Sequence, residues 1–173
     1  MNRASIEEAL SLLVWLRDRG HERVGVAGYS MGGAIAGHVA VRAPFAVALV
    51  CAATGTSCAT IYTRNLLGRQ VLWDRMGDPD EAKGRLGAFL DRMSFDLLPL
   101  PLDPVRARLV GCSRDGYVDR ERVISLHRHW TGSLLTWVDT GHVGGILMKA
   151  AAIRDAILDV FELGLDQATA SSI

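Results

Sequence analysis

The sequence predicts an α/β fold in which a mostly parallel sheet of about four strands is flanked by helices. Strand-like and helix-like segments alternate over both ends of the chain, and this alternation is typical of parallel sheets covered on both faces. The continuous apolar run over residues 45–52 supports the same fold class, because strands buried on both faces lose their alternation of polar residues. The chain has 173 residues, 49% of them hydrophobic, which suffices for one domain with a buried core.

The first half of the chain supplies two helices and two strands. A helix is predicted over residues 5–19, with Ser5 and Glu8 as a capping box. A strand over residues 23–27 follows, then a helix over residues 31–42 that ends before Pro44. The small residues of this helix allow close packing on a sheet, and residues 45–52 form the next strand.

Between residues 54 and 103 the alternation stops, and we expect an inserted helical cap. Two helices are predicted in it, over residues 61–75 and 79–95, the second with Asp78 as its N-cap. Ordinary packing of the cap is expected for most of its large apolar side chains, and lining of an acyl pocket is the alternative. These side chains are Leu66, Leu67, Leu72, Trp73, Leu86, Phe89, Leu90 and Met93.

The alternation then resumes with a strand over residues 107–112, a helix over 119–130, a strand over 134–138 and an amphipathic helix over 146–164. Residues 1–53 and 104–165 are therefore predicted to form the core and residues 54–103 the cap. Residues 166–173 are predicted to be a flexible tail.

Charge and composition exclude several kinds of partner. Lys and Arg number 19, as do Asp and Glu, so a nucleic acid or an anionic membrane is not expected as the main partner. No apolar run approaches the roughly 18 residues of a membrane span, and the first residues lack the pattern of a secretion signal. Cys51, Cys58 and Cys112 show no metal-ligand spacing, so we expect no bound metal and a cytoplasmic location.

The pattern G-x-S-x-G stands at residues 28–32, between a predicted strand and a predicted helix. In this setting it is typical of a nucleophile elbow, which holds a serine at the apex of a sharp turn. Gly28 and Gly32 are expected to avoid a clash across the turn, and the backbone N–H of Met31 is a candidate oxyanion donor. The alternative is a glycine-rich turn in which Ser30 only caps the helix.

A serine nucleophile needs a base and an orienting carboxylate, and functional groups of parallel sheets gather beyond the carboxyl ends of strands. Asp115 and Asp119 follow the strand over 107–112, and His142 follows the strand over 134–138. Asp119 is better placed to cap the next helix, and Asp139 lies too close to the end of its strand. For His142 the alternative to a base is a loop histidine bonded to the backbone. The order Ser, Asp, His is that of α/β-hydrolases.

His127 and His129 are expected on the solvated face of a helix, and no third group suggests a metal site.

The chain resembles the α/β-hydrolase superfamily in its esterase, lipase and thioesterase-like branches. Residues 115–119 (Asp-Gly-Tyr-Val-Asp) look like the acid loop of that superfamily, D-x-x-V-P, with Asp119 in place of the proline, and residues 140–142 look like its histidine loop. Together with Gly-His-Val-Gly-Gly at 141–145, they are similar to the α/β-hydrolase domain-containing protein 18-like group. The resemblance implies Ser30, Asp115 and His142 as a catalytic triad, no cofactor, and a small acyl ester or thioester, lipid-like in view of the cap, as substrate.

A full α/β-hydrolase has several strands before the elbow strand, whereas this sequence starts one helix before it. The resemblance therefore implies an N-terminally truncated chain without the loop that supplies the second oxyanion donor. Dimerisation through the open sheet edge at residues 23–27 is an alternative expectation. A serine hydrolase is the main functional hypothesis. An acyltransferase with the same triad and a non-catalytic fragment or interaction domain are the other two.

Overall fold

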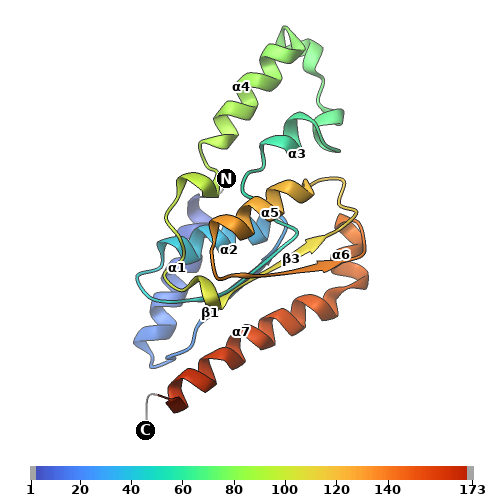
Figure 1. Ribbon diagram of the computed structural model, residues 1–173. Coiled ribbons are helices and arrows are strands. Elements are labelled where there is room, and N and C mark those ends of the chain that lie inside the picture. Colours follow the sequence, from blue (N-terminus) through green and yellow to red (C-terminus); the bar gives the residue numbers. More distant parts are fainter. Residues whose placement is uncertain (1–2, 171–173) are drawn as a thin grey trace.

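The computed structural model describes residues 3–170, with side chains through residue 162. A four-stranded parallel sheet in the order β1-β2-β3-β4 forms the centre of the molecule (Figure 1). This confirms the predicted fold class. The strands are β1 (Gly25–Tyr29), β2 (Ala48–Ala52), β3 (Ala107–Cys112) and β4 (Leu134–Val138). Within the described residues β1 pairs with β2 alone, so it is an edge strand, and dimerisation through it stays a prediction.

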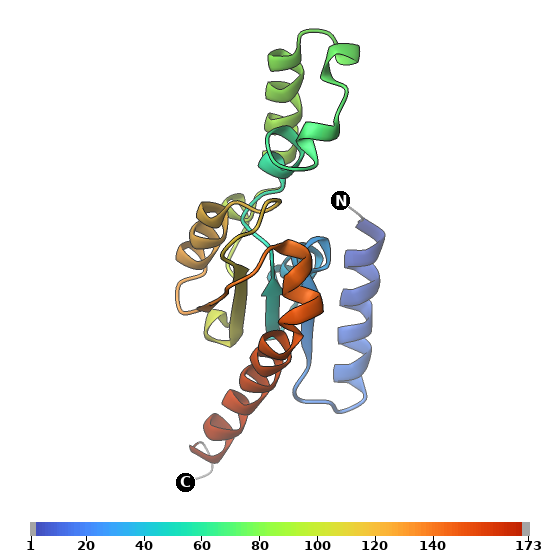
Figure 2. The ribbon, with the colours of Figure 1, turned by 90° about the vertical axis from the view of Figure 1, so that its right-hand side faces the viewer.

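Helices cover both faces of this sheet. On one face α2 (Met31–Arg42) and α5 (Arg120–His129) pack on the strands, and α1 (Arg3–Asp18) packs on the outside of α2. On the other face lies α7 (Ala150–Ala170), which follows the short helix α6 (His142–Met148) (Figure 2). None of the helices within residues 3–170 has the length and apolarity that crossing a bilayer demands.

The continuous apolar run of β2 follows from this double cover. Leu49 and Cys51 belong to the core beneath α2 and α5, whereas Val50 and Ala52 pack toward α7. Successive side chains of a strand point to opposite faces, so a strand between two helical layers must be apolar at every position. All five residues of β2 are buried.

The segment between β2 and β3 contains α3 (Ala59–Thr63) and α4 (Pro79–Asp91) and stands away from the sheet in both views (Figures 1 and 2). Asp78 is the N-cap of α4 as predicted, and its carboxylate accepts the backbone N–H groups of Asp80 and Glu81. The single helix predicted over 61–75 is wrong. After α3 the chain folds back so that Gly68 touches the last turn of that helix, and two short 3₁₀ turns follow at Gly68–Gln70 and Trp73–Met76.

Several other predicted boundaries change. Helix α4 ends at Asp91 instead of residue 95, and β2 begins at Ala48 instead of residue 45. Helix α1 already includes Ser5, so the capping box is wrong, and β1 begins at Gly25 instead of residue 23. The helix predicted over 146–164 is instead the pair α6 and α7, which are separated at Lys149. The predicted tail is helical through Ala170, and residues 171–173 lie outside the described residues.

An ion pair between a buried arginine and a half-exposed aspartate joins α7 to the sheet. Arg108 lies in β3 with its side chain buried, and its guanidinium pairs with the half-exposed carboxylate of Asp159 on α7. The same guanidinium donates to the backbone carbonyl of Val105 at 2.8 Å. A charge this buried needs a partner, because an unpaired buried charge loses its hydration without compensation.

We therefore expect Asp159→Asn to lower the free energy of unfolding by about 1–3 kcal/mol, measured by urea denaturation. Asp155→Asn is the matched control, since Asp155 pairs with Arg154 on the exposed side of the same helix. It should cost no more than about 0.5 kcal/mol. Equal decreases in the free energy of unfolding of the two variants would show that the Arg108–Asp159 pair does not stabilise the packing of α7 on the sheet.

Candidate active site

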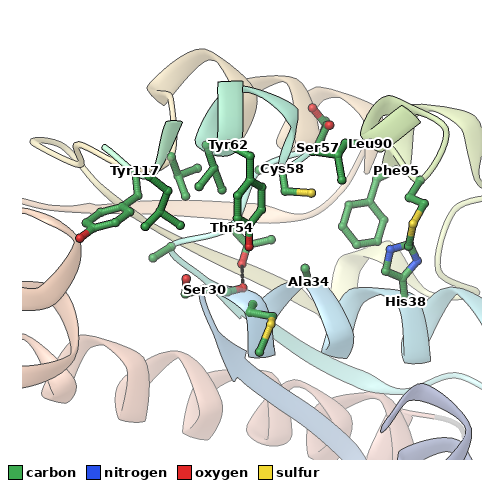
Figure 3. Close-up of a pocket in the computed structure, with 18 of the residues that line it drawn as sticks. Ser30, Ala34, His38, Thr54, Ser57, Cys58, Tyr62, Leu90, Phe95 and Tyr117 are labelled. Carbon is green, nitrogen blue, oxygen red and sulfur yellow. Dashed lines mark hydrogen bonds between the residues drawn. The ribbon is translucent and has the colours of Figure 1, made fainter. Parts of the chain in front are cut away.

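The turn from β1 into α2 places Ser30 beyond the carboxyl end of the sheet. Ser30 has φ 55° and ψ −118°, a backbone conformation that non-glycine residues rarely adopt and that persists only where the surroundings enforce it. Two hydrogen bonds from the end of β2 do so. The Ser30 N–H donates to Ala52 O at 2.8 Å, and the Thr54 hydroxyl donates to Ser30 O at 2.7 Å (Figure 3).

Of the two glycines in the motif, Gly28 is the one that the turn requires. A Cβ on Gly28 would collide with the backbone of Gly32 and Gly33, which closes over it at the start of α2. A Cβ on Gly32 would meet open space. The sequence-based expectation that both positions are crowded is therefore right for Gly28 and wrong for Gly32.

Asp115 is fixed in the loop that follows β3. Its Oδ1 accepts the backbone N–H of Tyr117 at 2.8 Å and that of Val118 at 3.0 Å, which is the geometry of an aspartate closing its own turn. These two bonds leave Oδ2 facing His142, and the side chain is only 3% exposed. The carboxylate is thus held in one orientation by backbone groups.

His142 lies between Asp115 and Ser30. Its Nδ1 is 2.7 Å from Asp115 Oδ2 and its Nε2 is 2.8 Å from Ser30 Oγ. Because an ionised carboxylate can only accept, Nδ1 carries the proton, and the neutral ring therefore presents Nε2 as an acceptor for the serine hydroxyl. The ring is 13% exposed and lies against the ring of Tyr117, at 4.8 Å between centroids.

Tyr29, the last residue of β1, anchors the backbone of His142. Its hydroxyl donates to the backbone carbonyl of His142 and also contacts the thiol of Cys112. Burial and the neighbouring Cys112 raise the pKa of Tyr29, so the phenol stays protonated and remains a donor. The strand before the serine and the helix that starts at His142 are thereby tied together directly.

The other carboxylates near these loops have different partners. Asp119 precedes α5 as predicted, but its side chain accepts from Asn65 Nδ2 at 2.9 Å and makes no capping bond. Asp139 pairs with Arg114 at 2.9 Å and accepts from Ser113. The structure therefore brings Asp115 to His142, and leaves Asp119 and Asp139 elsewhere.

The prediction of a solvated face for His127 and His129 is wrong. Both rings are part-buried, with His127 Nδ1 2.9 Å from Ser133 Oγ and His129 Nε2 3.2 Å from Leu98 O. They tie the end of α5 to the loop before β4, at Ser133, and to the segment before β3, at Leu98. Among the described residues no three His, Cys, Asp or Glu side chains gather in a way that could hold a metal ion.

A largely apolar cavity of about 440 Å³ opens beside Ser30, between α2 and the helical segment above it (Figure 3). Of the eight large apolar side chains that the sequence offered as a possible pocket lining, half line this cavity, namely Leu67, Leu86, Leu90 and Met93. Leu72 and Phe89 are exposed, and Trp73 is buried with its indole N–H on Gly68 O. Met31 also lines the cavity, and its backbone N–H belongs to the first turn of α2, where helices leave donors without an intrahelical acceptor.

Sequence reasoning missed several cavity residues, among them His38, Thr56, Phe95 and Tyr117. A signal existed for His38 alone, since Ala34 and His38 follow Ser30 at intervals of four and therefore share a face of α2. The others reach the cavity through loop packing, for which the sequence has no periodic pattern.

Comparison with known proteins places this fold in the α/β-hydrolase class. Solved structures similar to this chain include a hydrolase from Pseudomonas aeruginosa, with a TM-score of 0.54, 16% identity, and coverage of 90% of this chain and 69% of that one. The Pyrococcus furiosus esterase Pf2001 has a TM-score of 0.60 and 16% identity, over 91% of this chain and 61% of the esterase. The type II thioesterase YbtT of the yersiniabactin pathway has a TM-score of 0.58 and 18% identity, over 92% and 74%.

The family model described as alpha/beta hydrolase domain containing 18 matches residues 1–82 and 75–163, which together cover most of the chain. The chain belongs to this family. No curated protein matches it by sequence.

The two glycines of the elbow give a matched test of the turn. Gly28→Ala should lower the free energy of unfolding by about 3 kcal/mol or more, because its Cβ meets backbone that cannot move aside. Gly32→Ala should be neutral or stabilising by up to about 1 kcal/mol, since alanine is the better helix former. Thermal and urea unfolding check both values. A tolerated Gly28→Ala would contradict the described close approach.

Proposed function

We propose that this chain is a serine hydrolase that cleaves carboxylic ester or thioester bonds with Ser30, His142 and Asp115. The observation that carries the proposal is the unbroken hydrogen-bonded series from Ser30 Oγ through His142 to Asp115, placed at the wall of an apolar cavity. Esterases and thioesterases among the structural neighbours support an acyl substrate. The apolar lining favours a lipid-like acyl group.

Each group has a defined part in the proposed reaction. His142 Nε2 takes the proton of Ser30 as Oγ attacks the acyl carbon, and Asp115 stabilises the imidazolium that forms. The tetrahedral oxyanion accepts a hydrogen bond from the Met31 N–H, at the positive end of α2. The alcohol or thiol leaves with the proton from His142, and a water activated by His142 then releases the acid and restores Ser30.

We further propose that residues 54–103 act as a cap over the acyl group. Four of the predicted leucine and methionine side chains of this segment line the cavity that begins at Ser30. Closing an apolar surface over the acyl chain removes it from water and leaves the carbonyl at the serine.

The cytoplasmic location expected from the three cysteines stays a prediction.

Covalent labelling tests the proposed nucleophile. The purified, folded chain should form one adduct with a fluorophosphonate probe, read by intact mass, and Ser30→Ala should form none. Ser113→Ala is the matched control, because Ser113 also contacts a carboxylate, at 3.0 Å from Asp139, but makes no hydrogen bond to a histidine within the described residues.

The control variant should keep the adduct. A folded chain that forms no adduct, or one whose adduct survives Ser30→Ala, would overturn the proposal in favour of a non-catalytic role.

A further inference from the structure

The far end of the cavity holds a polar group that the proposed chemistry does not use. His38 lies two helical turns after Ser30 on α2, with Ala34 between them, and all three line the cavity. Figure 3 shows His38 and Tyr117 at opposite ends of the lining residues, with Ser30 between them. His38 is 2% exposed, and its Nε2 has no hydrogen-bond partner among the described residues.

The neighbours of His38 define which hydrogen-bonding group it offers. Arg42 Nη1 lies 3.0 Å from His38 Nδ1, and an arginine can only donate, so Nδ1 is the acceptor. The proton of the neutral ring is therefore on Nε2, which is a buried N–H without an acceptor. Burial, with the positive charge of Arg42, lowers the pKa of His38 to about 4, so the ring is neutral near pH 7.

A second buried polar atom belongs to another residue of the cavity lining. Thr56 is 1% exposed and lines the cavity, and its Oγ1 also has no partner within the described part of the chain. Phe95 links the two, because its ring stacks on His38 at 4.5 Å and its N–H donates to Thr56 O at 2.8 Å. Both residues line the same cavity, so a polar ligand atom there would supply the partner that buried polar groups almost always have.

We propose that His38 and Thr56 form a specificity site for an acyl chain that carries a hydroxyl group at its far end. The hydroxyl oxygen accepts from His38 Nε2–H, and its hydrogen is donated to Thr56 Oγ1. This inference rests on the proposed acyl hydrolysis at Ser30, since the serine fixes the other end of the chain.

The spacing on α2 sets the length of that acyl chain. Eight residues of α-helix separate Ser30 from His38, which is roughly 12 Å. Subtracting about 3 Å for the hydrogen bond leaves roughly 9 Å, or between about seven and eight bonds at the roughly 1.2 Å per bond of an extended chain. From carbonyl carbon to hydroxyl oxygen an ω-hydroxyoctanoyl group spans about eight such bonds, which is closer to this length than the six of the hexanoyl or the ten of the decanoyl homologue.

Paired esters test the proposal. The substrates are nitrophenyl esters of ω-hydroxyhexanoate, ω-hydroxyoctanoate and ω-hydroxydecanoate. Each is compared with the nitrophenyl ester of the same acid without the hydroxyl, and kcat/KM is measured for every ester. The hydroxylated ester should be preferred most at the octanoyl length, by about 10-fold or more, because the plain chain leaves two buried polar atoms unpaired. His38→Phe, which keeps a ring against Phe95, should lower this preference by about 10-fold or more, to near one.

Two threonines make the matched control. Thr60 Oγ1 is buried and without a partner like Thr56 Oγ1, but Thr60 is not among the residues that line the cavity. Thr56→Val should reduce the preference, and Thr60→Val should leave it unchanged. Thr56→Val also carries the test if His38→Phe fails to fold. A wild-type preference near one, or a preference that survives both His38→Phe and Thr56→Val, would overturn the inference.

A binding measurement separates this inference from the proposed function. In Ser30→Ala, calorimetry compares binding of ω-hydroxyoctanoate and octanoate methyl esters, with and without Thr56→Val. Tighter binding of the hydroxylated ester that Thr56→Val abolishes supports the specificity site even where the wild-type chain shows no turnover. Turnover of all esters without any preference rejects the site and leaves the hydrolase proposal standing.

Discussion

The reversal of the chain at Ser30 is the constraint on which the rest of the site depends. A strand that ends in a helix after a single residue requires a positive φ at that residue and a neighbour without a side chain at Gly28. The same reversal sets the start of α2, and with it the Met31 N–H and the helix face that carries Ala34 and His38. Ala52 and Thr54 from the end of β2 hold the reversal in place.

Parallel topology brings the other two groups to this point. Strands β3 and β4 run in the same direction as β1, so the loops that follow them emerge at the same edge of the sheet. Backbone N–H groups fix the carboxylate of Asp115, and the Tyr29 hydroxyl anchors the first residue of α6. Residues distant in sequence therefore meet at distances of 2.7 and 2.8 Å.

Much of the fold and of the site could be predicted, because the deciding signals are local. Helix α2 and strands β3 and β4 have the predicted bounds, since continuous apolar runs and the break at Pro44 mark them. Asp115 and His142 could be predicted as site residues because each lies in the loop after a predicted strand, and because they follow Ser30 in the order Ser, Asp, His. The sequence could place His38 on the α2 face that follows Ser30, but it could not predict the contact of His38 with Phe95 or the place of Thr56 in the cavity, since both depend on a distant turn.

The wrong boundaries have a common cause. Residues 61–75 have helical composition, but tertiary contacts fold Gly68 back onto α3, and Lys149 separates two helices that the apolar periodicity joins. Similarly, His127 and His129 look solvated by their place beside Arg128, whereas the loops at Ser133 and Leu98 cover them. Local propensity cannot report contacts of this kind.

The proposed role of Asp115, which is to orient His142 toward Ser30, is tested most directly by the rate at which a fluorophosphonate labels Ser30. This rate is compared between Asp115→Asn and Asp119→Asn. An asparagine at 115 can still accept from the Tyr117 and Val118 N–H groups, but its amide presents a donor to His142 and favours the wrong tautomer. We expect a rate lower by about 10³- to 10⁴-fold for Asp115→Asn and a change within about 10-fold for Asp119→Asn. Equal rates in the two variants, or a larger loss in Asp119→Asn, would contradict the proposed role.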